Sequence, residues 1–212
     1  MKLLIIGASG RLGKAISELA QTDKTIEITS KIGSLDPDIS PYLNSSEMII
    51  DVSTPAALKE NLPKIINAKK PLVIGSTGHN EREKAQITLA AKSIPILLVS
   101  NFSPGIACIK KLLPHLPEGH FQITETHHKQ KKDSPSGTSL DLAAHLPQDT
   151  HITSIRKDDI FGEHTITVTL PFETISITHT AHSRDLFAFG ALKACKFLLN
   201  KPCGLYTSFD ER

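Results

Sequence analysis

The chain has 212 residues, of which 39% are hydrophobic, and a formal net charge of +2. That length and apolar content allow a substantial core, in one large domain or two small ones. The longest apolar runs are far shorter than the roughly 18 residues of a membrane-spanning helix, and the first residues do not form a signal peptide, so we expect a cytoplasmic protein that binds no membrane. A near-neutral charge and 5% aromatic residues argue against nucleic-acid binding.

A glycine-rich turn follows the first predicted strand. The apolar run Leu3–Ile6 is typical of a buried parallel strand, and Gly7, Gly10 and Gly13 come directly after it. A pattern with helical spacing then runs to Ala20. A strand, a glycine turn and a helix in this order favour nucleotide binding, because glycine lets a pyrophosphate approach the backbone. The alternative is a tight turn without a ligand.

Strand-like and helical runs alternate through the first half of the chain. Strands are predicted over residues 26–29, 48–52, 72–74 and 96–99, and helices over residues 56–68 and 81–92. Pro63 predicts a kink or a split within the first of these helices. The alternation is typical of a Rossmann-like, doubly wound α/β domain.

The second half of the chain has a different pattern of predicted elements. After a helical pattern that begins near residue 106, the runs 151–155, 165–170 and 175–180 alternate Thr or Ser with apolar residues, as strands with one buried face do. An amphipathic helix over residues 186–199 follows. We therefore predict a dinucleotide-binding domain over 1–103, completed by a C-terminal helix within 184–212. A second, α+β domain over 104–183, with a mixed or antiparallel sheet, should bind substrate and form oligomers.

Histidine and lysine side chains gather in the segment 125–138, which includes His127, His128 and Lys131. Two imidazoles and three ammonium groups within six residues repel one another when charged, so we expect some of them to have a lowered pKa. Groups poised in this way suit proton transfer. The alternative is a solvated basic loop.

Ser136, Gly137 and Thr138 follow this basic segment and open a helical pattern with apolar residues at 140, 143, 144 and 146. A serine at this position caps a helix, and the N–H groups of the first turn attract an anion. We therefore expect a small carboxylate or phosphate ligand beside the histidines.

The cysteines and histidines do not show the spacing of a metal site. Cys108, Cys195 and Cys203 lie on apolar helical patterns, so we expect buried, reduced thiols. Nine of the ten histidines follow residue 114, but no nearby Cys or HExxH arrangement completes a tetrahedral site, so we expect no bound metal. The sequence places three of these histidines at strand surfaces or strand ends: His164, His179 and His182.

Three further motifs lie where predicted strands end, at residues 51–55, 75–78 and 100–105. Together with the glycine turn, they resemble the 4-hydroxy-tetrahydrodipicolinate reductase (dihydrodipicolinate reductase) family. The segment from His127 to Thr138 matches the family signature His-His-x-x-Lys-x-Asp-x-Pro-Ser-Gly-Thr, with Ser134 where alanine is common. Residues 162–165 and 183–191 are also similar to family motifs, so the resemblance runs nearly end to end.

The resemblance implies a reductase of lysine and diaminopimelate biosynthesis, which uses NADPH or NADH to reduce a cyclic imine dicarboxylate formed by loss of water from the 4-hydroxy compound. It implies Lys131 as proton donor and His127 as a second acid or base. His128 would bind one substrate carboxylate, and Gly137 with Thr138 the other. The cofactor-binding residues that it implies are Gly7, Ala8, Ser9, Gly10, Arg11, Leu12, Gly75, Ser76, Thr77, Val99, Ser100, Asn101 and Phe102.

Two departures from the family pattern carry expectations of their own. The second strand ends in Thr29-Ser30-Lys31, where many members have an acid for the adenosine ribose, so we expect Lys31 to pair with a 2′-phosphate and NADPH to be preferred. The family's long loop before Ile160, which helps to join subunits, is not found. We therefore expect a homo-oligomer that is a dimer rather than the family's tetramer.

Two other functions remain open at this point. One is a dinucleotide-binding sensor that keeps the fold without turnover, although the intact proton donors argue against it. The other is a related reductase of another small imine or amino acid, such as an aspartate-dehydrogenase-like enzyme. The paired carboxylate sites favour a dicarboxylate without fixing its ring.

Overall fold

The computed structural model describes residues 1–33, 38–131, 133–158 and 160–209. Lys132, one of the cations of the predicted basic segment, lies outside these residues. The chain divides into two compact units, one of Met1–Phe102 with Phe187–Arg212 and one of Ser103–Leu186.

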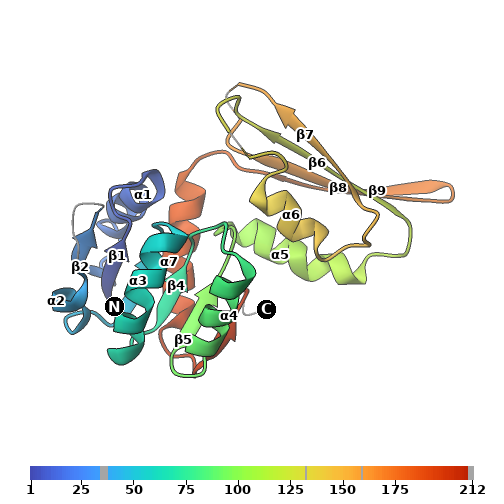
Figure 1. Ribbon diagram of the computed structural model, residues 1–212. Helices are drawn as coiled ribbons and strands as arrows, with labels where there is room; N and C mark the ends of the chain where they lie inside the picture. Colours follow the sequence, from blue (N-terminus) through green and yellow to red (C-terminus); the bar gives the residue numbers. More distant parts are fainter. Residues whose placement is uncertain (34–37, 132, 159, 210–212) are drawn as a thin grey trace. The chain divides into compact units, whose positions relative to one another are not determined.

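The first unit is built on a parallel sheet of six strands, in the order β10-β5-β4-β3-β1-β2 (Figure 1). The strands are β1 (Lys2–Ile6), β2 (Glu27–Ile32), β3 (Met48–Asp51), β4 (Leu72–Ile74), β5 (Pro95–Leu98) and β10 (Gly204–Tyr206). The helices are α1 (Arg11–Ala20), α2 (Ser40–Leu43), α3 (Pro55–Asn67), α4 (Glu81–Ala90) and α7 (Asp185–Leu198). Strand β2 lies on one side of β1 in the sheet, and β3, β4 and β5 follow on the other side. This reversal of direction confirms the doubly wound prediction.

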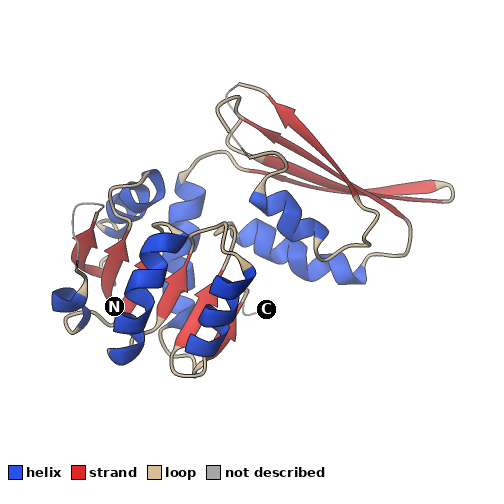
Figure 2. Ribbon diagram, in the orientation of Figure 1, coloured by secondary structure: helices blue, strands red, loops and turns tan. Residues whose placement is uncertain are grey.

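Both faces of this sheet are covered (Figure 2). Leu3 and Ile5 of β1 pack in a core with α1 and α7, whereas Leu4 and Ile6 pack in a second core with α3 and α4. Burial on both faces explains why the central strands are apolar throughout.

Helix α3 begins after Thr54, whose side chain accepts a hydrogen bond from the N–H of Ala57 at 3.3 Å. It continues through Pro63 to Asn67, so the expected split is wrong. Pro63 is exposed, as is Lys59 one turn earlier, and water can therefore satisfy the carbonyl that the proline leaves unpaired.

The second unit carries a mixed sheet in the order β7-β6-β8-β9, with β6 parallel to β7 and antiparallel to β8. Its strands are β6 (His120–His127), β7 (His151–Arg156), β8 (Glu163–Leu170) and β9 (Glu173–Thr180). Helices α5 (Pro104–Leu112) and α6 (Gly137–Ala143) lie on one face (Figure 1), where they share a core with Ile123 and Ile166. A short 3-10 turn, Leu113–His115, follows α5.

Two expectations about single residues are wrong. Cys195 is buried, but Cys108 and Cys203 are exposed, because one lies on the outer side of α5 and the other in the turn before β10. Among the described residues, no helix is long and apolar enough to cross a bilayer.

Candidate functional site

The glycine turn of the first unit is fixed by close backbone packing. Gly7 has φ +86°, and a Cβ there would lie 2.7 Å from the backbone nitrogen of Ser53. A Cβ at Gly13 would lie 2.2 Å from the carbonyl oxygen of Gly7. The N–H groups of Gly7 and Ala8 both donate to the carbonyl of Ile32 at 2.9 Å. Glycine is therefore required for the turn to lie this close to its neighbours.

A cavity of about 410 Å³ opens beside this turn. It lies at the carboxyl ends of β1 and β3, where the winding of the sheet reverses and α/β proteins bind nucleotides. Its lining residues come from four segments: Ile6, Gly7, Ser9, Gly10, Ile32, Gly33, Val52, Ser53, Thr54, Ala57, Glu60 and Asn61. The α3 side of the cavity was not among the predicted site residues. The backbone turn and the size of the cavity fit the adenosine and pyrophosphate of a dinucleotide.

The other predicted cofactor segments follow neighbouring strands. Gly75, Ser76 and Thr77 follow β4, and residues 99–102 follow β5. Phe102 is 3% exposed, and a Cβ at Gly75 would lie 2.3 Å from its ring, so its side chain belongs to the core. Lys31 is exposed near the end of β2, next to cavity residues Ile32 and Gly33.

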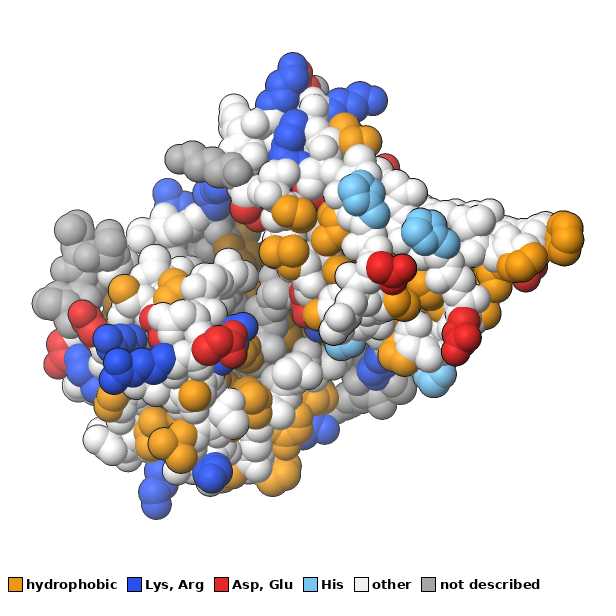
Figure 3. Space-filling view, turned by 45° about the vertical axis from the view of Figure 1, so that its right-hand side comes forward, with side chains coloured by type: hydrophobic (Ala, Val, Ile, Leu, Met, Phe, Trp, Pro, Cys, Tyr) orange, Lys and Arg blue, Asp and Glu red, His pale blue; other side chains and the backbone are white. Residues whose placement is uncertain are grey.

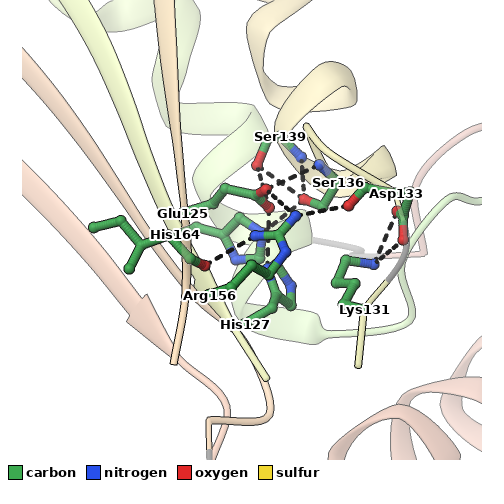
Figure 4. Close-up of polar contacts among 9 residues, drawn as sticks. Glu125, His127, Lys131, Asp133, Ser136, Ser139, Arg156 and His164 are labelled. Atoms are coloured by element: carbon green, nitrogen blue, oxygen red, sulfur yellow. Dashed lines mark hydrogen bonds and ion pairs between the residues drawn. The ribbon is translucent and has the colours of Figure 1, made fainter. Parts of the chain in front are cut away.

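In the second unit, a fully buried carboxylate lies at the centre of a polar network (Figure 4). The Oε1 atom of Glu125 accepts hydrogen bonds from the backbone N–H of Ser136 and from Arg156, each at 3.1 Å. Its Oε2 atom accepts from the hydroxyl of Ser139 at 3.2 Å and lies 3.0 Å from Nδ1 of His127. Burial disfavours the charge, but the hydrogen bonds outweigh it and lower the pKa of Glu125 to about 2.

His127 ends β6 and is buried. Burial lowers its pKa, as do Lys131 and Arg156, whereas Glu125 opposes the shift. A lowered histidine pKa in this segment was expected from the crowding of cations. The ring of His164 packs edge-on against that of His127, with 5.1 Å between centroids.

His164 is 3% exposed, so it does not lie on a strand surface; it is the second residue of β8 and lies near a strand end, the other place that was expected. It lies on the side of β8 that also carries Ile166 and Val168, and its Nε2 atom lies 3.3 Å from the hydroxyl of Ser136. Burial lowers its pKa to about 3, so the ring is neutral near pH 7. His179 is half-buried, with its Nε2 atom 2.8 Å from the hydroxyl of Ser103, while His182 is exposed in the loop after β9, as predicted.

Lys131 and Asp133 lie beside this network (Figure 4). The Nζ atom of Lys131 donates to the Asp133 carboxylate at 2.9 Å. Burial favours the neutral acid, but the hydrogen bonds from Lys131 and the backbone of Gly137 outweigh it and lower the pKa of Asp133. A carboxylate of the protein thus lies between the predicted proton donor and the first residue of α6.

His128 faces the other way along the extended chain and borders a hollow of about 770 Å³. The hollow is lined by His128, Lys129, Gln130, Asp158, Ile160, Phe161 and Arg184. The second unit therefore brings His127, Lys131 and the start of α6 to one network, with His128 in the adjoining hollow.

The network also gathers three groups that could in principle bind a metal. One atom from each of Glu125, His127 and His164 lies within 4.8 Å of the others. Both oxygens of Glu125 already accept hydrogen bonds, and the guanidinium of Arg156 lies against one of them. The negative charge of Glu125 is therefore paired with a cation of the protein, as in a salt-bridge network. The absence of a bound metal remains a prediction.

Glu125, Arg156 and His164 were not predicted as site residues, although the pattern of β6 contains a signal for the first. Phe121 and Ile123 alternate on its buried face, and the same alternation carries Glu125 and His127 inward. An acid at a core position demands a buried partner. His164 of β8 lies directly beside Glu125 in the sheet, and Arg156 of β7 lies directly beside His127.

Comparisons with known proteins agree along the whole chain. Residues 1–102 match the model "Dihydrodipicolinate reductase, N-terminus", and residues 105–210 match "Dihydrodipicolinate reductase, C-terminus". A 4-hydroxy-tetrahydrodipicolinate reductase of Xanthomonas euvesicatoria pv. vesicatoria is 38% identical over 230 aligned positions, covering 99% of this chain and 97% of the relative.

Two solved structures share the fold. Dipicolinate-bound dihydrodipicolinate reductase from Paenisporosarcina sp. TG-14 has a TM-score of 0.81 at 18% identity and covers 98% of this chain and 97% of its own. Aspartate dehydrogenase from Thermotoga maritima has a TM-score of 0.60 at 13% identity and covers 95% of this chain and 98% of its own.

Proposed function

Because the chain belongs to the dihydrodipicolinate reductase family, we propose that it reduces 4-hydroxy-tetrahydrodipicolinate to tetrahydrodipicolinate with NAD(P)H. It is an oxidoreductase of lysine and diaminopimelate biosynthesis. The observation that carries the proposal is the network in which Lys131 and His127 lie beside the start of α6. Substrate-dependent oxidation of NADPH by the purified protein is its test.

The chain's own residues have separable tasks in this reaction. Lys131 donates a proton to the cyclic imine as reduction occurs, and His127 is a second acid or base. His128 binds one carboxylate of the substrate, and Gly137 with Thr138 binds the other. A substrate carboxylate that binds at Lys131 and α6 must compete with Asp133, which holds those groups in this structure.

The first unit would hold the nucleotide, which supplies the hydride when bound. The pyrophosphate would contact Gly7, Ala8, Ser9, Gly10, Arg11 and Leu12. The nicotinamide end would contact Gly75, Ser76, Thr77, Val99, Ser100, Asn101 and the backbone of Phe102. The glycine turn fits this role, because a Cβ at Gly7 or Gly13 would close the approach to the backbone.

We expect NADPH to bind more tightly than NADH, because the ammonium of Lys31 can pair with the 2′-phosphate. Lys31→Glu should reverse or flatten the preference, since it replaces an attraction with a repulsion. Calorimetric dissociation constants for both nucleotides at matched salt test this expectation. Lys24→Glu makes the same charge change at another exposed position before β2 and should keep the preference. Equal constants for the two nucleotides in the unmodified protein would contradict the role of Lys31.

We further propose that the chain forms a dimer through the second sheet. Its outward face is polar, with Thr165 and Thr178 hydrogen-bonded across β8 and β9 at 3.0 Å. Phe172 is fully exposed at the turn between these strands, where hydrophobic side chains cover the end of the hairpin (Figure 3). The Xanthomonas relative aligns over 230 positions, more than the 212 residues here, which agrees with a shortened segment.

Light scattering over a dilution series should therefore give the mass of a dimer at micromolar concentration. Specific activity should persist as the dimer dissociates, because each chain carries both the nucleotide unit and the substrate unit. A tetramer that persists to nanomolar concentration would overturn the assembly proposal. Activity that falls in step with dissociation would overturn the independence of the subunits.

A related reductase of another small imine is the second candidate function, and the aspartate dehydrogenase neighbour shows that the fold is compatible with it. The two functions differ in substrate. Turnover with oxaloacetate and ammonia, but not with 4-hydroxy-tetrahydrodipicolinate, would favour this second candidate.

A further inference from the structure

We propose that Glu125 is a positioning residue for this reaction, whose single buried carboxylate holds the acid/base group His127 and the start of α6 in one arrangement. This inference rests on the proposed function for the identity of the reaction. The coupling itself is a property of the second unit and can be measured without turnover.

The two oxygens of Glu125 have different partners. Oε1 accepts from the N–H of Ser136, the residue that caps α6, and from Arg156 of β7. Oε2 accepts from the hydroxyl of Ser139 in the first turn of α6 and lies 3.0 Å from Nδ1 of His127. Both oxygens thus bind the start of α6, while each also contacts one cationic or titratable group (Figure 4).

The contact with His127 is close, but it is not aligned as a hydrogen bond, since Nδ1 has no hydrogen-bond partner among the described residues. The influence of Glu125 on the ring is therefore chiefly electrostatic. In a buried site such a charge acts strongly, because little water screens it.

Among the described residues, five charged or titratable groups face His127. Two carboxylates, Glu125 and Asp133, favour its protonated form, whereas two cations, Lys131 and Arg156, disfavour it. The fifth group, the neutral ring of His164, packs against its edge. Glu125 is the strongest of the influences that favour protonation, so it opposes the loss of the proton that burial promotes.

The orientation of the ring supports this role. Nδ1 lies toward Glu125, whereas Nε2 lies toward Gly162, where an added Cβ would be 3.2 Å away. Glycine leaves space beside Nε2, the nitrogen that is not held by the carboxylate. With Nδ1 next to a negative charge, a proton on the neutral ring is favoured at Nδ1, and Nε2 is left to exchange protons.

Two substitutions should change the pKa of His127 in opposite directions. Glu125→Gln keeps the shape and an acceptor for Ser136 but removes the charge, so the pKa of His127 should fall by about one unit or more. Arg156→Met removes a cation and should raise it. Glu173→Gln, an exposed carboxylate at the start of β9, is the matched control and should leave it unchanged.

The measurement is an NMR titration of the His127 ring in the ligand-free protein, beside the pH profile of kcat/KM. For Glu125→Gln we expect the profile to shift with the titration. With His127 acting as an acid, kcat/KM at neutral pH should fall by about tenfold, since one unit of pKa changes the protonated fraction by a factor of ten. Arg156→Lys, which keeps the charge, should restore the unmodified profile. A role in folding alone would not give opposite shifts or this rescue.

Two results would overturn the proposal: shifts of the same sign in Glu125→Gln and Arg156→Met, or no shift in folded Glu125→Gln protein. Thermal unfolding shows whether each variant is folded. Ser139→Ala provides a milder test, because it removes one hydrogen-bond donor from Glu125. It should weaken substrate binding more than it changes the pKa of His127. If the two variants show opposite shifts but the unmodified chain has no reductase activity, the proposed function fails while the coupling stands.

Discussion

Lys131→Ala should lower kcat by about 10²-fold or more, because a positioned general acid typically contributes about 10²–10⁴-fold to rate. The Lys131 ammonium lies in the Glu125 network and pairs with Asp133, which holds it in place. It belongs to the second unit, so the dissociation constant for NADPH should stay nearly unchanged. Steady-state kinetics and calorimetry measure the two quantities separately.

Two companion variants show whether the loss is specific. Thr138→Ala should mainly raise KM, because a carboxylate contact made equally in the ground state and the transition state affects binding rather than turnover. Lys157→Ala removes an exposed cation that follows β7 and should leave kcat unchanged. If Lys131→Ala retains full kcat at neutral pH, Lys131 is only a solvated charge, and the acid must be sought at His127.

Gly13→Ala should have the largest effect on the nucleotide unit. Its Cβ would lie 2.2 Å from the Gly7 carbonyl oxygen and 2.7 Å from the Ala8 Cα, and these backbone atoms cannot move without opening the turn. Overpacking of this kind lowers the free energy of unfolding by about 1–3 kcal/mol. If the displaced turn also costs about 1.4 kcal/mol of binding, the dissociation constant for NADPH rises tenfold.

Thermal unfolding and calorimetry test this expectation. Glu18→Ala, at an exposed position of the same helix, should change neither quantity appreciably. Unchanged nucleotide affinity in folded Gly13→Ala protein would show that the cavity beside the glycine turn does not hold the pyrophosphate. Reductase activity would then require another nucleotide site.

The first unit was predictable because its residues obey local rules. Four of its strands are short apolar runs that are buried on both faces, and the glycine turn has a sequence signature with a physical cause. The missed strand, β10, has three residues, Gly204–Tyr206, and is fixed by pairing with β5 at the edge of the sheet. Strand β4 also has three residues, but all three are apolar and buried, whereas Gly204–Tyr206 is partly exposed and contains no apolar run that could indicate a strand.

The second unit was predictable in outline but not in its polar interior. Strand β6 was not predicted, since its buried face changes from Phe121 and Ile123 to Glu125 and His127, which interrupts the apolar alternation. The network needs Arg156 from β7 and His164 from β8, so it depends on the register between strands that are distant in the sequence. The clustered cations indicated the segment of His127 and Lys131, and the resemblance implied their roles, whereas the charges that tune them required the fold.

The most direct test of the account is NADPH absorbance in the presence of purified protein and enzymatically generated 4-hydroxy-tetrahydrodipicolinate. We predict oxidation of NADPH that depends on both the substrate and the protein, together with formation of tetrahydrodipicolinate in equal amount. The same assay with Lys131→Ala should show the loss of rate without loss of nucleotide binding. Tight NADPH binding with no substrate-dependent oxidation would contradict the account and indicate a nucleotide-binding sensor.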